Sequence, residues 1–221
     1  MKQRTLTRKL EAAHLSPQMR NFTFERFDLR YYSAFVYDEE RSRSYLETAR
    51  LALHTARNFV RSFLNNEAPE GILFTGPVGS GKTFLACCIV NAIVTSPGQQ
   101  VLFVVVPDFL DQIRATYDDN NDYTEQQLLD SAKTIPLLVL DDLGAHHYSE
   151  WALQKIYSIL NYRLNYSLPT IITTNISLDE MQEHLGERTA SRIVQLCRPV
   201  RLLVDVDIRI ARRMQNGTMG R

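Results

Sequence analysis

Eight consecutive residues combine glycines, a lysine and a hydroxyl at a spacing suited to phosphate binding. The segment GPVGSGKT, residues 76–83, follows the apolar run ILFT. Gly79 and Gly81 permit backbone conformations that a Cβ would obstruct, and backbone N–H groups at the start of a helix attract phosphate. Lys82 can reach the β- and γ-phosphates, and the Thr83 hydroxyl can ligate Mg²⁺. The pattern predicts a P-loop that binds ATP and Mg²⁺.

The sequence on both sides of this segment supports the same interpretation. ILFT is typical of a short buried strand, and FLACCIVNAIV is typical of a helix covered on both sides. The alternative is a glycine turn between core elements that binds no ligand. The residues expected to contact the nucleotide are Gly76, Pro77, Val78, Gly79, Ser80, Gly81, Lys82, Thr83 and Phe84.

A second stretch with chemistry, LLVLDD at residues 137–142, has the form of a Walker B motif. It is an apolar strand that ends in two carboxylates. Because ligands gather at the carboxyl ends of strands in open α/β sheets, we expect Asp141 to lie near the Mg²⁺ held by Thr83. Asp142 could then polarise the attacking water. Two acids at a strand end can also form a solvated turn, and the P-loop about 60 residues earlier favours the catalytic alternative.

Two further segments carry candidate catalytic side chains. The strand TIITTN ends at Asn175, which is expected to act as a sensor of the γ-phosphate or of the lytic water; a turn asparagine is the alternative. In the helix at 187–197, Arg188 and Arg192 share a face. Like charges four residues apart are mildly destabilising, which a nearby anion would offset. We expect this face to meet the nucleotide of a neighbouring subunit and supply an arginine finger, with a solvated basic face as the alternative.

The packing side of the predicted helix at 187–197 is expected to comprise Ala190, Ile193, Val194 and Cys197. Five apolar strand candidates, at 72–75, 101–106, 137–142, 170–175 and 200–206, alternate with helical patterns. Such alternation predicts a five-stranded, parallel, doubly wound α/β sheet flanked by helices. Ser44 with Glu47, Thr124 with Gln127, and Ser177 with Glu180 are predicted to form capping boxes.

The chain before the first long helix is predicted to form an arm and a lead-in. Residues 1–43 comprise a basic arm, with a possible short helix at 6–15, and an aromatic-rich lead-in segment; 44–213 form the ATPase domain and 214–221 a short basic tail. The aromatic residues of the lead-in are expected to pack on the domain. Alternatively, Phe24 to Asp28 lies over the adenine of the bound nucleotide.

Charge is balanced overall but is unevenly distributed. The 221 residues include 25 basic and 25 acidic side chains, so no global field indicates nucleic-acid binding. Residues 1–64 carry 12 basic against 7 acidic side chains, 184–221 carry 8 against 3, and 108–150 carry 2 against 10. This asymmetry is compatible with a DNA channel or with head-to-tail self-association, and equally with solvated faces that have no partner.

The cysteines and the hydropathy pattern favour a cytoplasmic protein over a secreted or membrane protein. Cys87, Cys88 and Cys197 form no CxxC pair, so neither a disulfide framework nor a zinc site is indicated. No apolar run approaches the length of a membrane span, and the first residues lack the apolar core of a signal peptide. We therefore expect a cytoplasmic protein with no membrane contact.

The motifs GPVGSGKT, LLVLDDLGA, TTN and LGERTASRI, in this order, resemble those of the AAA+ ATPases of the bacterial helicase-loader type, the DnaC/DnaI family. The similarity covers about residues 17–213. It implies Lys82 and Thr83 on ATP and Mg²⁺, Asp141 on Mg²⁺ and Asp142 as the catalytic acid. It also implies that Asn175 is sensor 1.

The resemblance extends to two arginines and to the partners. Arg192 corresponds to the family's trans-acting finger, and Arg209, after the last strand, to its sensor 2. The family implies a homo-oligomer with shared ATP sites that places a DnaB-like replicative helicase on single-stranded DNA. Many relatives have Glu where Asp142 stands, which implies weaker hydrolysis. Only about 15 residues follow the predicted last strand, so the helical lid is expected to be absent or reduced.

Three other functions remain open from the sequence. A transposition helper of the IstB type has the same fold. An adaptor that binds ATP without appreciable hydrolysis would share the same motifs. A P-loop kinase would need an arginine-rich substrate lid, against which the acidic segment at 108–133 argues.

Overall fold

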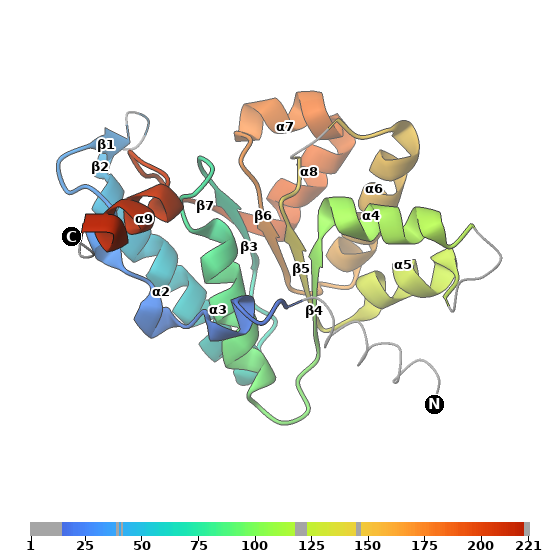
Figure 1. The fold of residues 1–221 in the computed structure, drawn as a ribbon. Helices are drawn as coiled ribbons and strands as arrows, with labels where there is room; N and C mark the ends of the chain where they lie inside the picture. Colours follow the sequence, from blue (N-terminus) through green and yellow to red (C-terminus); the bar gives the residue numbers. More distant parts are fainter. Residues whose placement is uncertain (1–14, 39, 41, 118–122, 145–146, 219–221) are drawn as a thin grey trace.

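A five-stranded parallel sheet forms the centre of the computed structural model, which describes residues 15–38, 40, 42–117, 123–144 and 147–218. The strands are β3 (Gly71–Thr75), β4 (Val101–Val105), β5 (Leu137–Asp141), β6 (Thr170–Thr173) and β7 (Cys197–Arg201). Their spatial order is β4-β5-β6-β3-β7, and every pairing in this sheet is parallel (Figure 1). The predicted five-stranded α/β sheet is confirmed. β3, which leads into the P-loop, lies between β6 and β7.

Helices cover both faces of the sheet. On one face lie α2 (Tyr45–Leu64) and α3 (Lys82–Val94); on the other lie α4 (Val106–Ala115), α5 (Glu125–Thr134), α6 (Glu150–Asn165), α7 (Leu178–Leu185) and α8 (Glu187–Leu196) (Figure 1). Side chains alternate between the two cores, so that Ile72 and Phe74 face α2 and α3 while Leu73 faces the other layer. Strands buried on both faces explain the nearly continuous apolar runs in the sequence.

Local sequence signals fix where several helices begin. The Ser44 hydroxyl accepts the backbone N–H of Glu47, and the Glu47 carboxylate accepts the N–H of Ser44. The same reciprocal pairs form at the starts of α5 and α7. All of the predicted capping boxes are therefore confirmed.

The aromatic lead-in packs on α3, as expected. It consists of short 3₁₀ turns, η1 (Met19–Asn21), η2 (Phe24–Arg26) and η3 (Leu29–Tyr31), followed by a small antiparallel pair, β1 (Tyr37–Asp38) and β2 (Arg43–Ser44). Phe22 stacks on Phe84 with ring centroids 4.4 Å apart. The Asn91 side-chain amide donates to the carbonyls of Met19 and Phe22. The lead-in thus shares the core of the sheet rather than forming a unit of its own.

Two predictions near the end of the chain are wrong. The last strand was expected at residues 200–206, but β7 spans Cys197–Arg201, because α8 ends at Leu196 and Cys197 immediately pairs with Gly71. Leu202 is fully buried, although its backbone turns away from the sheet after donating to the Thr75 carbonyl. Val194, expected on the packing side of α8, is 51% exposed. The buried α8 side chains are Thr189, Ala190, Ile193 and Leu196.

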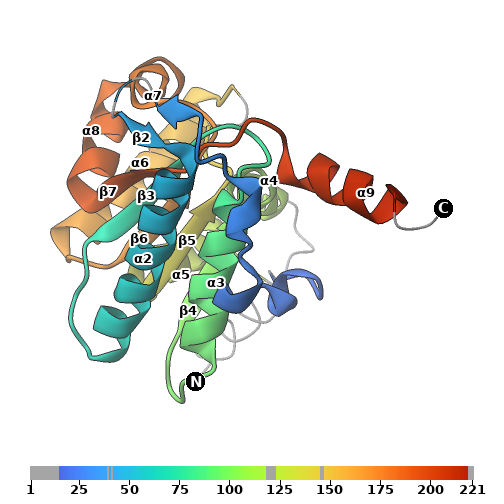
Figure 2. The ribbon, with the colours of Figure 1, turned by 90° about the vertical axis from the view of Figure 1, so that its left-hand side faces the viewer.

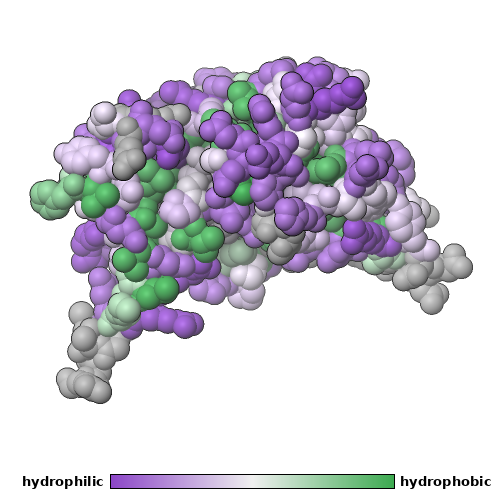
Figure 3. Space-filling model, turned by 90° about the horizontal axis from the view of Figure 1, so that it is seen from above, coloured by the Kyte–Doolittle hydropathy of each residue, from purple (hydrophilic) through white to green (hydrophobic). Residues whose placement is uncertain are grey.

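The final helix, α9 (Ile208–Thr218), runs across the expected start of the tail at residue 214 and projects from the body of the molecule (Figure 2). The surface seen from above is mostly hydrophilic, with hydrophobic residues scattered toward the side of α9 (Figure 3). The possible helix at residues 6–15 falls almost entirely outside the described residues. Among the described helices, none combines the length and the apolar character that a membrane crossing requires.

Candidate nucleotide-binding site

The P-loop backbone adopts a conformation that requires glycine. Gly76, Gly79 and Gly81 have φ values of 137°, 75° and 95°. A Cβ on Gly76 would lie 2.0 Å from the Leu202 carbonyl oxygen, and one on Gly79 would lie 2.0 Å from the Asp207 carboxyl carbon. The loop leads directly into α3, whose first helical residue is Lys82. This cradle at a helix N-terminus fits a polyphosphate, which binds backbone N–H groups and tolerates no side chain there.

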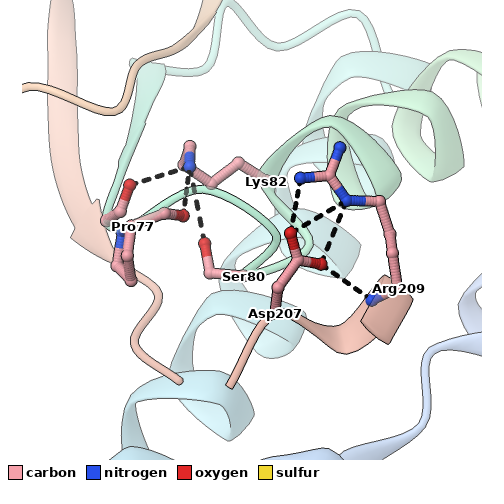
Figure 4. A network of polar contacts seen from close by, with 6 residues as sticks. Pro77, Ser80, Lys82, Asp207 and Arg209 are labelled. Carbon is pink, nitrogen blue, oxygen red and sulfur yellow. Dashed lines mark hydrogen bonds and ion pairs between the residues drawn. The ribbon is translucent and has the colours of Figure 1, made fainter. Parts of the chain in front are cut away.

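The Lys82 ammonium bends back over the loop. It donates to the carbonyls of Gly76 at 2.8 Å and Pro77 at 2.7 Å, and lies 3.5 Å from the Ser80 hydroxyl (Figure 4). Burial lowers the pKa of Lys82 to about 8, although Asp142 and Asp141 favour its charged form. A bound phosphate would supply the anion that this desolvated cation lacks.

Thr83 and Asp141, the predicted magnesium ligands, are in contact. The Thr83 hydroxyl donates to Asp141 Oδ1 at 2.9 Å across the ends of α3 and β5. The Thr173 hydroxyl donates to the same oxygen at 2.6 Å. Burial raises the pKa of Asp141, while these two hydroxyls favour its ionised form. A hydroxyl beside a carboxylate is the oxygen donor set that Mg²⁺ uses at nucleotide sites, so these residues fit that ion.

The two remaining polar candidates lie at the same edge of the sheet. Asp142 directly follows β5, is exposed, and has a φ of 61°, which is uncommon for a residue other than glycine. Asn175 lies two residues beyond the end of the neighbouring strand β6 and is also exposed. Both side chains are thus accessible at the edge where Lys82 and Asp141 lie.

Arg209 lies next to the P-loop. The Ile208 N–H donates to the Gly79 carbonyl at 3.1 Å, which ties the start of α9 to the loop. The Arg209 guanidinium binds both carboxylate oxygens of Asp207 (Figure 4). This pair lowers the pKa of Asp207 below its usual value. The start of α9 therefore holds Arg209 beside the P-loop, and its role as sensor 2 stays a prediction.

A cavity of about 420 Å³ opens beside the P-loop and is lined by Lys82, Thr83 and Arg209. Its other wall is aromatic, with Phe27 and Phe84 facing it. The buried Tyr32 hydroxyl donates to the Ser80 carbonyl at 2.7 Å and so joins the lead-in to the loop. A cavity lined by both phosphate-binding groups and aromatic rings suits a nucleotide, which combines phosphates with a planar base.

The structure brings together most of the predicted residues and leaves some apart. Within the described part of the chain, the predicted residues that line the cavity are Gly79, Gly81, Lys82, Thr83, Phe84 and Arg209. Those that do not line it include Gly76, Pro77, Val78, Ser80, Asp141, Asp142 and Asn175. Arg188 and Arg192 lie on α8 and do not line the cavity either. Arg192 instead binds the Gln195 side chain at 3.1 Å.

Sequence reasoning missed four residues at this site. Thr173 binds Asp141, Tyr32 binds the P-loop, and Asp207 holds Arg209. Arg212 lies over the rings of Tyr31 and Phe84, with its guanidinium carbon 5.5 Å and 5.9 Å from their centroids. Only Thr173 had a visible signal, as part of the polar triplet that ends its strand.

Comparison with known protein families identifies the family to which these motifs belong. The family model described as IstB-like ATP binding protein matches residues 2–198, which include the P-loop, Asp141, Asp142 and Asn175. The chain belongs to this family. The predicted relationship to the AAA+ helicase loaders is likewise confirmed by the relatives it matches.

The matched proteins include two replicative helicase loaders. DnaI of Bacillus subtilis (strain 168) is 29% identical over 170 residues, which cover 71% of this chain and 53% of DnaI. DnaC of Escherichia coli (strain K12) is 34% identical over 142 residues, which cover 64% of this chain and 56% of DnaC. The chain therefore spans about half the length of these relatives.

Solved structures confirm the AAA+ fold. The crystal structure of the DnaC helicase loader superposes with a TM-score of 0.66 at 28% identity, over 85% of this chain and 99% of that one. AMPPCP-bound DnaA from Aquifex aeolicus superposes with a TM-score of 0.65 at 20% identity, over 91% of this chain and 56% of that one, and shows the fold alone.

Proposed function

We propose that this protein is an ATPase that uses ATP·Mg²⁺ to help place a DnaB-like replicative helicase on single-stranded DNA. The observation that carries the proposal is the contact between Thr83 and Asp141 at the mouth of the P-loop. It joins the two motifs that together hold a nucleoside triphosphate and its metal. The loader names of the relatives supply the biological setting.

Each residue of the site has a chemical role in this proposal. Lys82 binds the β- and γ-phosphates and offsets their charge, while Thr83 and Asp141 hold Mg²⁺, which supplies further positive charge when bound. Asp142 accepts a hydrogen bond from the attacking water and orients it. Asn175 senses the γ-phosphate. Its exposure, like that of Asp142, leaves it accessible to substrate.

The same proposal includes a homo-oligomer whose ATP sites are shared between subunits. Arg192 of one subunit, or Arg188 on the same helix, stabilises the transition state at the site of the next, and Arg209 contacts the nucleotide within its own chain. Neither arginine lines the cavity of its own chain, and Arg188 is exposed, which supports a role at the site of a neighbouring subunit. We place this activity in the cytoplasm, where it meets helicase and DNA.

The experiment that tests the function is a pull-down with the replicative helicase of the same cell, with and without ATP. Helicase captured by the wild-type chain in an ATP-dependent manner, and not by Lys82→Ala, is expected. ATP turnover measured with helicase and single-stranded DNA present would rise above the rate of the chain alone. Absence of helicase capture in every nucleotide state would contradict the loader assignment.

The match to the IstB-like family favours one alternative, a transposition helper that remodels DNA for a transposase. The two functions differ in partner and share the ATPase chemistry. Capture of the transposase, and not of the helicase, would select the helper. ATP-dependent capture without measurable turnover would select the non-hydrolysing adaptor, an outcome compatible with the shorter carboxylate at Asp142.

A further inference from the structure

We propose that Thr173 is a positioning residue whose single hydroxyl orients both Walker B residues, Asp141 and Asp142. The inference rests on the proposed ATP·Mg²⁺ site. Thr173 Oγ1 donates to Asp141 Oδ1 at 2.6 Å and accepts the backbone N–H of Asp142 at 3.0 Å. A hydroxyl has one proton, so donation to Asp141 leaves its lone pairs for Asp142. The Thr173 side chain is 1% exposed, so water does not compete for either bond.

The first consequence concerns the orientation of Asp141. Thr83 and Thr173 donate to the same oxygen, Oδ1, one from α3 and one from the neighbouring strand β6. Two donors on one oxygen fix the rotation of the carboxylate. Thr83 can donate its proton to Asp141 and still offer oxygen lone pairs to a metal ion. Thr173 then anchors the carboxylate independently of the P-loop.

The second consequence concerns the backbone of Asp142. Its φ of 61° is a left-handed conformation, which is strained for a residue with a side chain. The bond from the Asp142 N–H to Thr173 stabilises this conformation, in which the Asp142 side chain is exposed. Thr173 therefore acts on Asp141 through its side chain and on Asp142 through its main chain.

The parallel register of the sheet explains why Thr173 can make both contacts. Leu140 of β5 pairs with Ile172 of β6, so the next residues, Asp141 and Thr173, lie side by side at the carboxyl ends of their strands. The following residue, Thr174, is equally buried, but its hydroxyl donates to the Leu143 carbonyl at 2.6 Å and touches neither carboxylate. Thr174 is therefore a matched control for the loss of a buried hydroxyl.

The test compares Thr173→Val, Thr173→Ser and Thr174→Val in the full chain. Calorimetric titration of ADP at increasing Mg²⁺, and in EDTA, gives the half-saturating Mg²⁺ concentration apart from catalysis. Loss of an outer-shell partner typically costs 10- to 100-fold in metal affinity or activity. For Thr173→Val we expect kcat to fall by about 10-fold or more and the half-saturating Mg²⁺ concentration to rise, with KM and ADP affinity in EDTA nearly unchanged. Thr173→Ser should restore both values.

Thr174→Val is expected to lower the melting temperature without changing the Mg²⁺ dependence. If Thr173→Val does not fold, Thr173→Ala provides the same comparison without the branched side chain. A Thr173 variant whose Mg²⁺ dependence and kcat equal those of Thr174→Val would overturn this inference and leave the ATP site intact. A wild-type chain that binds no ADP at any Mg²⁺ concentration would overturn the proposed function and this inference together.

Discussion

Two buried polar networks lie at opposite ends of the four-residue strand β6. The first binds mainly backbone carbonyls, and the second binds a side chain of the candidate site. At the start of the strand, Thr170 accepts from Arg163, which is 0% exposed. At its end, Thr173 donates to Asp141. The Arg163 guanidinium also donates to backbone carbonyls, those of Ala132, Lys133, Ile135, Pro136 and Pro169. Burial lowers the pKa of Arg163 to about 9.

The two networks contain buried cations of different kinds: Arg163 has a structural role, and Lys82 is available to a ligand. All the acceptors around Arg163 are held by the fold, and those of Ala132 and Lys133 are last-turn carbonyls of α5, which favour a cation. Lys82 instead binds carbonyls of its own loop, next to exposed polar side chains. Burial and a shifted pKa therefore do not identify a functional residue by themselves. Its access to a ligand does.

The largest expected effect contrasts Arg163 with another arginine, Arg192. Arg192 lies on the surface of α8, so Arg192→Ala should leave the melting temperature nearly unchanged. If it is the arginine finger, its loss should lower ATP turnover about 10³-fold while nucleotide affinity stays close to wild type. Turnover measured at several protein concentrations checks this, with Arg50→Ala, at an exposed position on α2, as the control. Equal turnover per subunit in wild type and variant at all concentrations would contradict the trans role.

The next effect concerns stability alone. Arg163→Leu should lower the free energy of unfolding by about 3–5 kcal/mol, because it leaves several buried carbonyls without donors. Urea denaturation measures the change, and Arg61→Leu, at an exposed position on α2, is the control. A loss below about 1 kcal/mol would show that water replaces the guanidinium, and Arg163 would then have no structural role to compare with Lys82.

Lys82 provides a pH-dependent test at the other end of the sheet. Its pKa is about 8 in the folded protein and 10.5 in the reference state, so the unfolded chain binds more protons between these values. Stability should therefore rise with pH across this window, by up to about 3 kcal/mol, relative to Lys82→Met, which has no group to titrate. Urea denaturation of both proteins at pH 7, 8.5 and 10 compares them. Parallel pH profiles would show that the Lys82 pKa is not depressed.

The smallest effect tests the join between the lead-in and the P-loop. Tyr32→Phe removes the hydrogen bond to the Ser80 carbonyl but keeps the ring in the core. We expect a loss of about 1 kcal/mol in stability and a few-fold weaker ATP binding. Tyr31→Phe, whose hydroxyl binds Gln215 at the surface, is the control. Identical ATP affinities for the two variants would show that the lead-in does not support the loop.

The sequence predicts the motif residues of the site better than the residues that hold them in place through tertiary contacts. The P-loop, the Walker B strand and the capping boxes are local patterns, and each appears in the structure at the expected residues. Thr173 could not be assigned, because its role depends on the register between β5 and β6. Arg163 carried no signal, since its partners are mainly backbone carbonyls, several of them about 30 residues away. The last strand was misplaced because the apolar run at 200–206 resembles a strand, whereas β7 spans Cys197–Arg201.

The proposed function depends on Lys82 binding a triphosphate whose Mg²⁺ is held by Thr83 and Asp141. Calorimetric titration of the wild-type chain and of Asp141→Asn with ATP, in Mg²⁺ and in EDTA, tests it most directly. We expect one saturable site per wild-type chain, with tighter ATP binding in Mg²⁺ than in EDTA, and a smaller gain in affinity from Mg²⁺ in the variant. An absence of ATP binding, or the same gain from Mg²⁺ in both proteins, would contradict it.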